Sequence, residues 1–494
     1  MNFYTNVYYT GSNILLRQIN GGSVEKARIN FSPSLFLISP KKTEFKTIDG
    51  RNLEEMNFLN VYEMNNFKTT YEKVDNFEIH GDIGVEYQYI AKEYGAESSY
   101  DMRKIKVLYI DIETECENGF PDIRQANERI NAITCMCNKK KVVFCLGEYE
   151  PHEDNIEANC YQDEQQMLRD FIEYMSATQP DIISGWNIRF FDIPYIVNRC
   201  NRILDKKDTV KISPWGIIKD KIVEKNNSEH QVYELVGIST LDYYELYKTF
   251  TYVNQESYKL DHIAYVELGE RKISYTEYDH ISEFYKKNFQ KFIEYNIKDT
   301  ELVEKLEEKL RLLELAVALA YSAGVNYGDV FSQVRTWDVI IYNALKKNNI
   351  IIPPKKINVK DDQYAGAYVK DPIVGMHDWV VSYDVNSLYP SLIIHFNISP
   401  ETMIEKNFKG KIKISDILEK KKDSETFKCM ELAKEYGCSI AANGTMYSNH
   451  TQGFLPMLMD KMYKDRKEFK NKMIDAKKKL EEVNLEMKKR GLTK

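Results

Sequence analysis

Residues Lys104-Ile-Lys-Val-Leu-Tyr-Ile-Asp111-Ile-Glu113 form an apolar run rich in β-branched residues. Such a run predicts a buried strand. Downstream we expect two or three further strands over 126–146, a helix over 165–175 and another strand over 180–184. Because strands and helices alternate, this part of the chain predicts an α/β domain.

The length of 494 residues suggests about three domains in the whole chain, so we expect further domains beside this one. The first ~100 residues read as short strands separated by turns. A β-hairpin is expected over 221–236, helices over 284–321, a boundary at Pro353-Pro354 and a strand over 378–384. Pro456 opens a basic helix that runs nearly to the end. The fold class is therefore a mixture of α/β and α+β domains.

Composition and sequence pattern argue against several classes of protein. Eight scattered Cys residues without paired Cys-x-x-Cys spacing indicate neither a disulfide scaffold nor a zinc ribbon, so we expect a reducing, intracellular setting. The start of the chain lacks the pattern of a signal peptide, and no window of ~18 uncharged apolar residues predicts a membrane span. The net charge is −7, but 451–494 carries 13 Lys+Arg against 7 Asp+Glu. A basic groove for nucleic acid explains that segment, yet charge alone favours a solvated Lys-rich helix.

Two acidic residues lie on the first strand. Asp111 and Glu113 are two positions apart, so both side chains project from the same face. Two like charges on an otherwise apolar strand repel each other and lose solvation, which favours protonation of one unless a cation intervenes. The pair is a candidate metal site, although a solvated strand end explains the same two residues.

Two later segments add acidic residues. Asp192 stands before Ile193-Pro194, where proline suits the first turn of a helix, so Asp192 is a candidate ligand, a helix N-cap, or both. Tyr295 and Asp299 are four apart in a segment with helical spacing, so they share one face. Neither segment is informative alone.

The order of the three segments is informative. Asp-x-Glu on a strand, Asn187…Asp192 before a helix, and Tyr-x-x-x-Asp on a later helix resemble the DEDDy class of 3′→5′ exonucleases. Carboxylates are hard oxygen ligands, and two divalent ions about 4 Å apart assist both ends of an in-line displacement at phosphorus. The resemblance implies a ribonuclease H-like domain with Mg²⁺ (Mn²⁺ as a possible substitute) held by Asp111, Glu113, Asp192 and Asp299, and with Tyr295 orienting the attacking water.

A second motif lies at Ser382-Tyr-Asp384-Val-Asn-Ser-Leu-Tyr389-Pro-Ser391. It resembles motif A of the B-family DNA polymerases, Asp-x-x-Ser-Leu-Tyr-Pro-Ser, at every defining position. A turn that ends a strand is the structural alternative. The resemblance implies that Mg²⁺ is bound by Asp384 and the Val385 carbonyl, that the dNTP triphosphate is bound by the N–H groups of Ser387 and Leu388, and that Tyr389 packs beneath the incoming sugar.

Shorter matches follow the order expected of that family. Tyr364-Ala-Gly366-Ala resembles a segment that contacts the template strand, and Ser257-Tyr258-Lys-Leu resembles a segment of the exonuclease domain. Arg466 and Lys470, four apart on the basic helix, resemble the fingers residues that bind the triphosphate, although any basic exposed face has the same pattern. The resemblance also implies DNA contact for Asn187, Tyr364 and Gly366.

Nearly the whole chain takes part in the resemblance. The chain resembles the B-family DNA polymerases of T-even-type bacteriophages at three further segments, Phe191-Asp-Ile-Pro-Tyr, Thr336-Trp-Asp and Asn397-Ile-Ser-Pro-Glu-Thr402. The implied domains are an N-terminal domain (1–104), an exonuclease domain (105–311), a return segment of the N-terminal domain (312–355), a partial palm with motif A (356–452) and the first part of the fingers (453–494). The implied location is the cytoplasm of an infected bacterium.

Two motifs of that family do not occur in the 494 residues. These are motif B, Lys-x-x-x-Asn-Ser-x-Tyr-Gly, and motif C, Tyr-Gly-Asp-Thr-Asp-Ser; Tyr327-Gly-Asp329 lacks the second Asp and precedes motif A. We expect DNA primer-template, single-stranded DNA and dNTPs as partners, and nucleotide addition only with a second polypeptide that supplies both motifs. A sliding clamp is expected to bind through a C-terminal part outside this sequence.

Three explanations of the missing motifs stay open: a natural split polymerase, a truncated product, and a stand-alone exonuclease. A DNA-binding scaffold without catalysis is a further alternative. Retention of all four carboxylates favours an enzyme over the scaffold.

Overall fold

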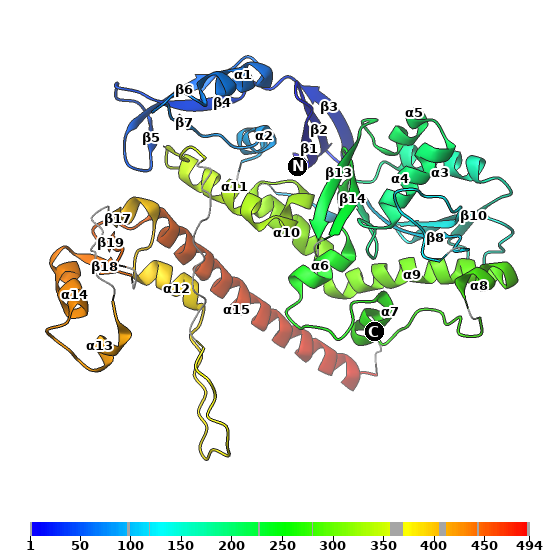
Figure 1. Cartoon of the computed structure of the whole chain (residues 1–494). Coiled ribbons are helices and arrows are strands. Elements are labelled where there is room, and N and C mark those ends of the chain that lie inside the picture. Colours follow the sequence, from blue (N-terminus) through cyan, green and yellow to red (C-terminus); the bar gives the residue numbers. More distant parts are fainter. Residues whose placement is uncertain are drawn as a thin grey trace. The chain divides into compact units, whose positions relative to one another are not determined.

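The structure is a computed structural model of the chain (Figure 1). It describes residues 2–95, 99–117, 119–225, 228–278, 280–355, 369–404, 412–441 and 444–491. The chain forms two compact units. Unit 1 comprises Met1–Leu35, Glu55–Phe77 and Asp82–Asn343, and unit 2 comprises Phe36–Glu54, Glu78–Gly81 and Ala344–Lys494. The domain boundaries expected from the sequence stay a prediction.

A six-stranded mixed sheet forms the centre of unit 1. Its strands are ordered β11-β10-β9-β8-β12-β15. β9 is antiparallel to both β8 and β10, whereas β12 is parallel to β8 and to β15, and β11 is parallel to β10. The expected strands are confirmed as β8 Val107–Thr114, β9 Ile130–Cys137, β10 Lys140–Leu146 and β12 Ile182–Ser184. The sheet also contains β11 Ile156–Tyr161 and β15 Ser239–Thr240, which the sequence analysis did not predict.

Helices cover both faces of this sheet (Figure 1). On one face, Leu108, Ile110 and Ile112 of β8 pack in a core with α3 (Glu164–Thr178) and α4 (Asp192–Ile203). On the other face, a second core joins β9 and β10 to α8 (Ile281–Lys287) and α9 (Phe289–Leu310). Since side chains alternate along a strand, Asp111 and Glu113 project from the face of β8 that is opposite to the first core.

Unit 1 contains further elements besides this sheet and the helices that cover it. Asn226-Asn227 of the expected hairpin turn lie outside the described residues, and the hairpin strands β13 and β14 on either side are confirmed. The bounds are β1 Asn2–Tyr9, β2 Ile14–Asn20, β3 Ser23–Ile29, α1 Val61–Tyr71, α2 Val85–Glu93, η1 Met102–Lys104, α5 Lys206–Thr209, η2 Val210–Ile212, β13 Ile218–Lys225, β14 Ser228–Leu235, α6 Tyr243–Phe250, α7 Leu260–Leu268, α10 Leu312–Ala323, η3 Tyr327–Phe331 and α11 Gln333–Lys346 (continuing into unit 2).

The expectation of only strands and turns in the first ~100 residues is wrong at α1 and α2. Helix α1 buries only Val61 and Met64, so its sequence lacks the apolar stripe that identifies a helix. Helix α2 buries Tyr87, Tyr89 and Ile90, residue types that also suit strands.

Unit 2 contains two small sheets and a long helix. The sheets are ordered β16-β5-β6-β4-β7 and β17-β19-β18. The expected basic helix is confirmed as α15. The bounds are β4 Ser34–Ile38, β5 Phe45–Thr47, β6 Asn52–Asn57, β7 Ile79–His80, β16 Ile350–Ile351, α12 Leu388–His395, η4 Pro400–Thr402, β17 Met403–Ile404, α13 Ile414–Leu418, α14 Glu425–Glu435, β18 Cys438–Ile440, β19 Met446–Ser448 and α15 Phe454–Lys489.

The strand expected over 378–384 is not observed. These residues are irregular, and Trp379 and Tyr383 are almost fully exposed. An extended segment becomes a strand only when a neighbour pairs with its backbone, and no strand of the described residues pairs with this one. In the described part of the chain, every helix is too short or too polar to cross a bilayer.

Candidate metal centre

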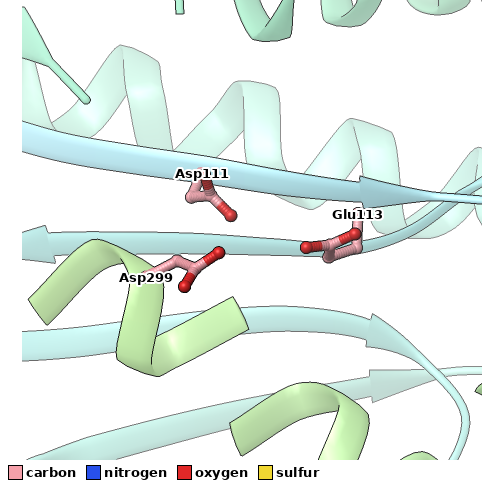
Figure 2. Close-up of side chains that lie close together, drawn as sticks. All are labelled: Asp111, Glu113 and Asp299. Atoms are coloured by element: carbon pink, nitrogen blue, oxygen red, sulfur yellow. The ribbon is translucent and has the colours of Figure 1, made fainter. Parts of the chain in front are cut away.

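Three carboxylates from two elements of unit 1 converge. Figure 2 shows Asp111 and Glu113, from β8, pointing toward Asp299, from α9. One ligand oxygen of each lies within 4.8 Å of the other two. Within the described residues, this is the only group of three acidic, His or Cys side chains with such spacing. The two-residue spacing on the strand therefore places Asp111 and Glu113 together as predicted.

Asp192, from a third element, lies beside this group and close enough to raise the pKa of Asp111. Asp192 is the first residue of α4, and its Oδ1 accepts a hydrogen bond from the backbone N–H of Ile112, with 3.0 Å between N and O. Ile112 lies between Asp111 and Glu113 on β8. The helix N-cap is Phe191, so the expectation that Asp192 caps the helix is wrong, and its carboxylate binds the strand instead.

Two features fix the loop before Asp192: the close packing of Gly185 against β8 and the hydrogen bonds of the loop to the buried carboxylate of Asp242. A Cβ added to Gly185 would lie 2.4 Å from the carbonyl oxygen of Ile110, so only glycine lets this loop pass against β8. The carboxylate of Asp242, which is fully buried, accepts hydrogen bonds from the backbone N–H groups of Asn187 and Arg189. Burial raises the pKa of Asp242 to about 6.

The four carboxylates disfavour one another's charge. Burial, with repulsion from Asp192, Asp299 and Glu113, raises the pKa of Asp111 well above its ordinary value. Burial and the charge of Asp299 raise the pKa of Glu113 to about 8. Burial likewise raises the pKa of Asp192 to about 7 and that of Asp299 to about 6. A cluster whose ionised form is this costly is suited to binding cations.

A buried oxygen of Asp299, unpaired within the part of the chain that the structure describes, is a second observation that supports divalent-cation binding by the cluster. Asp299 is only 3% exposed, and among the described residues its Oδ1 has no hydrogen-bond partner. A buried carboxylate oxygen without a donor is costly unless something positive binds it. The donors are all carboxylate oxygens, the ligand type that Mg²⁺ and Mn²⁺ prefer.

A lysine that sequence analysis missed contacts two of the expected site residues. The ammonium of Lys272 lies 2.5 Å from Oδ2 of Asp299 and donates a hydrogen bond of 2.6 Å to the hydroxyl of Tyr295. Burial lowers the pKa of Lys272, but Asp299 and Tyr295 outweigh burial and raise it, so the lysine stays charged. Burial and the charge of Asp299 raise the pKa of Tyr295, which therefore stays protonated. Tyr295 and Asp299 share one face of α9, as predicted.

A buried amide that sequence analysis also missed orients Asp111. Asn296 Nδ2 donates a hydrogen bond of 2.7 Å to Oδ2 of Asp111, and the hydroxyl of Thr134 donates to Oδ1 of Asn296. Thr134 is paired with Asp111 across β8 and β9, and both Thr134 and Asn296 are fully buried. The pairing register of β8 and β9 shifts between Glu113 and Thr114, an irregularity at the strand end that carries the site.

The expected polymerase residues lie in unit 2 and do not form such a cluster in the described structure. Asp384 and Val385 are exposed in the irregular segment before α12. Ser387 is the N-cap of α12 in a left-handed conformation (φ 51°), and Leu388 and Tyr389 begin the helix. Arg466 and Lys470 share one exposed side of α15.

The residues expected to contact DNA are placed only in part. Asn187 is exposed in the loop before Asp192, with a left-handed backbone (φ 66°). Tyr364 and Gly366 lie outside the described residues.

Comparison with known proteins places both parts of the chain in one family. A profile described as "DNA polymerase family B, exonuclease domain" matches residues 44–263, and one described as "DNA polymerase family B" matches residues 331–492. The two matches cover the four carboxylates except Asp299, and all of motif A.

Several relatives resemble the chain. The DNA-directed DNA polymerase of Escherichia phage RB69 is 32% identical over 504 aligned residues, which cover 96% of this chain and 54% of the phage protein. That of Enterobacteria phage T4 is 30% identical over 512 residues, covering 98% of this chain and 55% of the phage protein. The DNA polymerase delta catalytic subunit of Candida albicans is 25% identical over 398 residues, covering 75% of this chain and 35% of the yeast protein. The chain thus spans about half the length of the phage polymerases, and it belongs to DNA polymerase family B.

Proposed function

We propose that unit 1 is a ribonuclease H-like 3′→5′ exonuclease of the DEDDy class, which removes nucleotides from the 3′ end of a DNA strand. The observation that carries this proposal is the convergence of Asp111, Glu113, Asp192 and Asp299, from three separate elements, at one partly buried point. The family match and the two phage relatives support DNA as the substrate.

In the proposed site the carboxylates hold two Mg²⁺ ions. When bound, these ions supply charge stabilisation at the attacking and leaving oxygens of the phosphodiester. Asp111, Glu113 and Asp299 provide the ligand oxygens that already lie together, and Asp192 adds a carboxylate fixed to β8.

Tyr295 and Lys272 orient the attacking water in this proposal. The Tyr295 hydroxyl accepts a hydrogen bond from the Lys272 ammonium and so keeps its own proton to donate. The positive charge of Lys272 also keeps Asp299 ionised at neutral pH, because it opposes the effect of burial on that carboxylate.

An aromatic pair beside Asp192 supports binding of a single strand. Phe120 is 81% exposed, and its ring lies 5.3 Å from that of Phe191, the residue before Asp192. Exposed aromatic rings bind unpaired bases by stacking, which needs no particular base sequence. With Asn187 in the same loop, this pair is the proposed place for the terminal bases.

The test is digestion of a 5′-labelled single-stranded oligonucleotide with Mg²⁺ or with EDTA. We expect Mg²⁺-dependent shortening from the 3′ end, and a loss of about 100-fold or more for Asp192→Asn. Asp205→Asn is the matched control, because Asp205 is an exposed aspartate that also stands at a helix start. Undiminished digestion by folded Asp192→Asn protein would refute the metal assignment.

For unit 2 we propose the motif A part of a DNA polymerase site. Asp384 and the Val385 carbonyl are the proposed Mg²⁺ ligands, and the N–H groups of Ser387 and Leu388 with Arg466 and Lys470 are the proposed dNTP contacts. Motif A and the polymerase-family match at 331–492 support this. Nucleotide addition is proposed to need motifs B and C in addition.

The remaining partners follow from the same proposal. Primer-template DNA and dNTPs are the proposed substrates, and the similarity to two phage polymerases supports activity in an infected bacterial cell. A second polypeptide and a sliding clamp stay predictions.

A further inference from the structure

Lys272 lies in a segment with no regular structure of its own. Residues 270–275, between α7 and α8, form neither helix nor strand. Backbone in such a segment is fixed only by the contacts that individual groups make. The side chain of Lys272 nevertheless reaches two site residues at hydrogen-bond distance. Something outside the segment must therefore fix its backbone.

Several contacts tie this segment to its surroundings, among them the ion pairs of Glu270 with Lys298 and Lys305 of α9. At Lys272 itself, the contact to the backbone is made by Asp261. It lies in the first turn of α7, and its Oδ1 accepts a hydrogen bond from the backbone N–H of Lys272, with 2.9 Å between N and O. Its Oδ2 accepts from Nη1 of Arg271 at 2.6 Å. One carboxylate thus holds two consecutive residues of the segment against a helix.

We propose that Asp261 is a positioning residue of the exonuclease, which fixes the backbone of Lys272 so that its ammonium reaches Asp299 and Tyr295. This inference rests on the proposed exonuclease function and adds a residue that contacts neither the reacting atoms nor the metal ligands. Loss of a hydrogen bond that positions a site residue typically lowers activity by about 10- to 100-fold.

The two bonds of Asp261 differ in importance. The Asp261 and Arg271 side chains are 38% and 56% exposed, and exposed ion pairs contribute little. Arg271 also has a second contact, since its guanidinium lies 4.1 Å from the centre of the Tyr265 ring. The bond to the Lys272 backbone is therefore the one on which positioning depends.

A second explanation of any effect is the charge of Asp261, which is close enough to act on Asp299 through space. The amide of Asp261→Asn separates the two explanations, because it lacks the charge but keeps an oxygen that accepts from the Lys272 N–H. Asp261→Ala lacks both. Arg271→Ala removes only the exposed ion pair.

The experiment measures kcat and KM for digestion of the 5′-labelled oligonucleotide by the full chain and these three variants. We expect kcat of Asp261→Ala to fall about 10-fold or more with KM unchanged, and Asp261→Asn and Arg271→Ala to stay within about threefold of the wild type. In a Lys272→Ala background, Asp261→Ala is expected to have no further effect, because the group that it positions is gone. Wild-type kcat in Asp261→Ala, an equal loss in Asp261→Asn, or additive losses in the double variant would each overturn the inference.

Hydrogen exchange of the 270–275 segment gives a readout besides activity. Faster exchange is expected in Asp261→Ala and wild-type exchange in Asp261→Asn. A wild-type chain that digests no DNA would overturn the proposed function and with it the positioning role. Digestion by the wild type together with unchanged exchange in Asp261→Ala would overturn the inference alone.

Discussion

The backbone N–H of Ile112 donates a hydrogen bond to the carboxylate of Asp192, which lies 80 positions later in the chain. Ile112 directs its side chain into the core below the sheet, whereas its neighbours Asp111 and Glu113 direct their carboxylates to the opposite face. One backbone group thereby fixes the start of α4 beside Asp111 and Glu113, the proposed metal ligands of β8. The arrangement depends on Gly185, because any Cβ there would collide with the strand.

Lys272→Met is expected to lower exonuclease kcat about 100-fold, because it removes the charge that holds Tyr295 and Asp299. The loss also raises the pKa of Asp299, since Lys272 opposes the effect of burial. The acid limb of the pH–rate profile should therefore move to higher pH. Lys286→Met, at an exposed lysine that pairs with Glu117, is the control. An unchanged profile in Lys272→Met would contradict the assigned role.

Thr134→Val is expected to weaken the metal site without touching a ligand. Valine has the shape of threonine but donates no hydrogen bond to Asn296, so the amide is free to turn away from Asp111. We expect the Mg²⁺ concentration for half-maximal digestion to rise about 10-fold, with Thr134→Ser near the wild type. Equal Mg²⁺ dependence in all three proteins would show that Asn296 does not orient Asp111.

Metal-free protein is expected to lose stability as pH rises through neutrality. The pKa of Glu113 is raised from 4.5 to about 8 in the folded chain, so the folded state binds its proton more tightly than the unfolded state does. Stability from this group is full at low pH and falls as pH rises between those two values, by at most about 1.4 kcal/mol per pH unit.

The measurement is the thermal midpoint in EDTA at about pH 6 and about pH 8, with Mg²⁺ restoring the midpoint at the higher pH. Glu113→Gln should show a smaller decline, because glutamine does not titrate. A midpoint in EDTA that rises over the same interval would contradict the electrostatic account.

Asp384→Asn tests whether the activity proposed for unit 1 is independent of the motif A residues in unit 2. Because Asp384 lies in unit 2 and outside the carboxylate cluster, we expect exonuclease activity to stay within about twofold of the wild type. The purified 494-residue chain is expected to extend no primer with dNTPs, since motifs B and C are absent from its sequence. Primer extension that is abolished by Asp384→Asn would contradict this expectation.

The strand of the proposed exonuclease site could be predicted because its signals are local. The β-branched run before Asp111 identifies β8, and the spacing of Asp111 and Glu113 places them on one face. The same holds for Tyr295 and Asp299 on α9. The convergence of the four carboxylates was expected only from the family resemblance, because no local pattern links residues so distant in sequence.

The residues that orient the site could not be found in this way. Lys272 is one lysine among many and lies in an irregular segment, and Asn296, on α9, has a fully buried amide whose partners lie on β8 and β9, far away in the sequence. The prediction of a strand over 378–384 is wrong although the local pattern is present. No strand in the described part of the chain pairs with this segment. The sequence pattern of a segment shows only its propensity to form a strand, whereas the presence of a neighbouring strand decides whether the strand forms.

Titration of the chain with Mn²⁺, followed by the paramagnetic signal of the free ion, shows whether the carboxylates of unit 1 bind divalent cations. We predict tight binding that is lost in the double variant Asp111→Asn/Glu113→Gln and kept in Asp384→Asn, because the carboxylate cluster of unit 1 is the proposed site. Equal Mn²⁺ binding by the wild type and the double variant would contradict the claim that these side chains hold the catalytic ions.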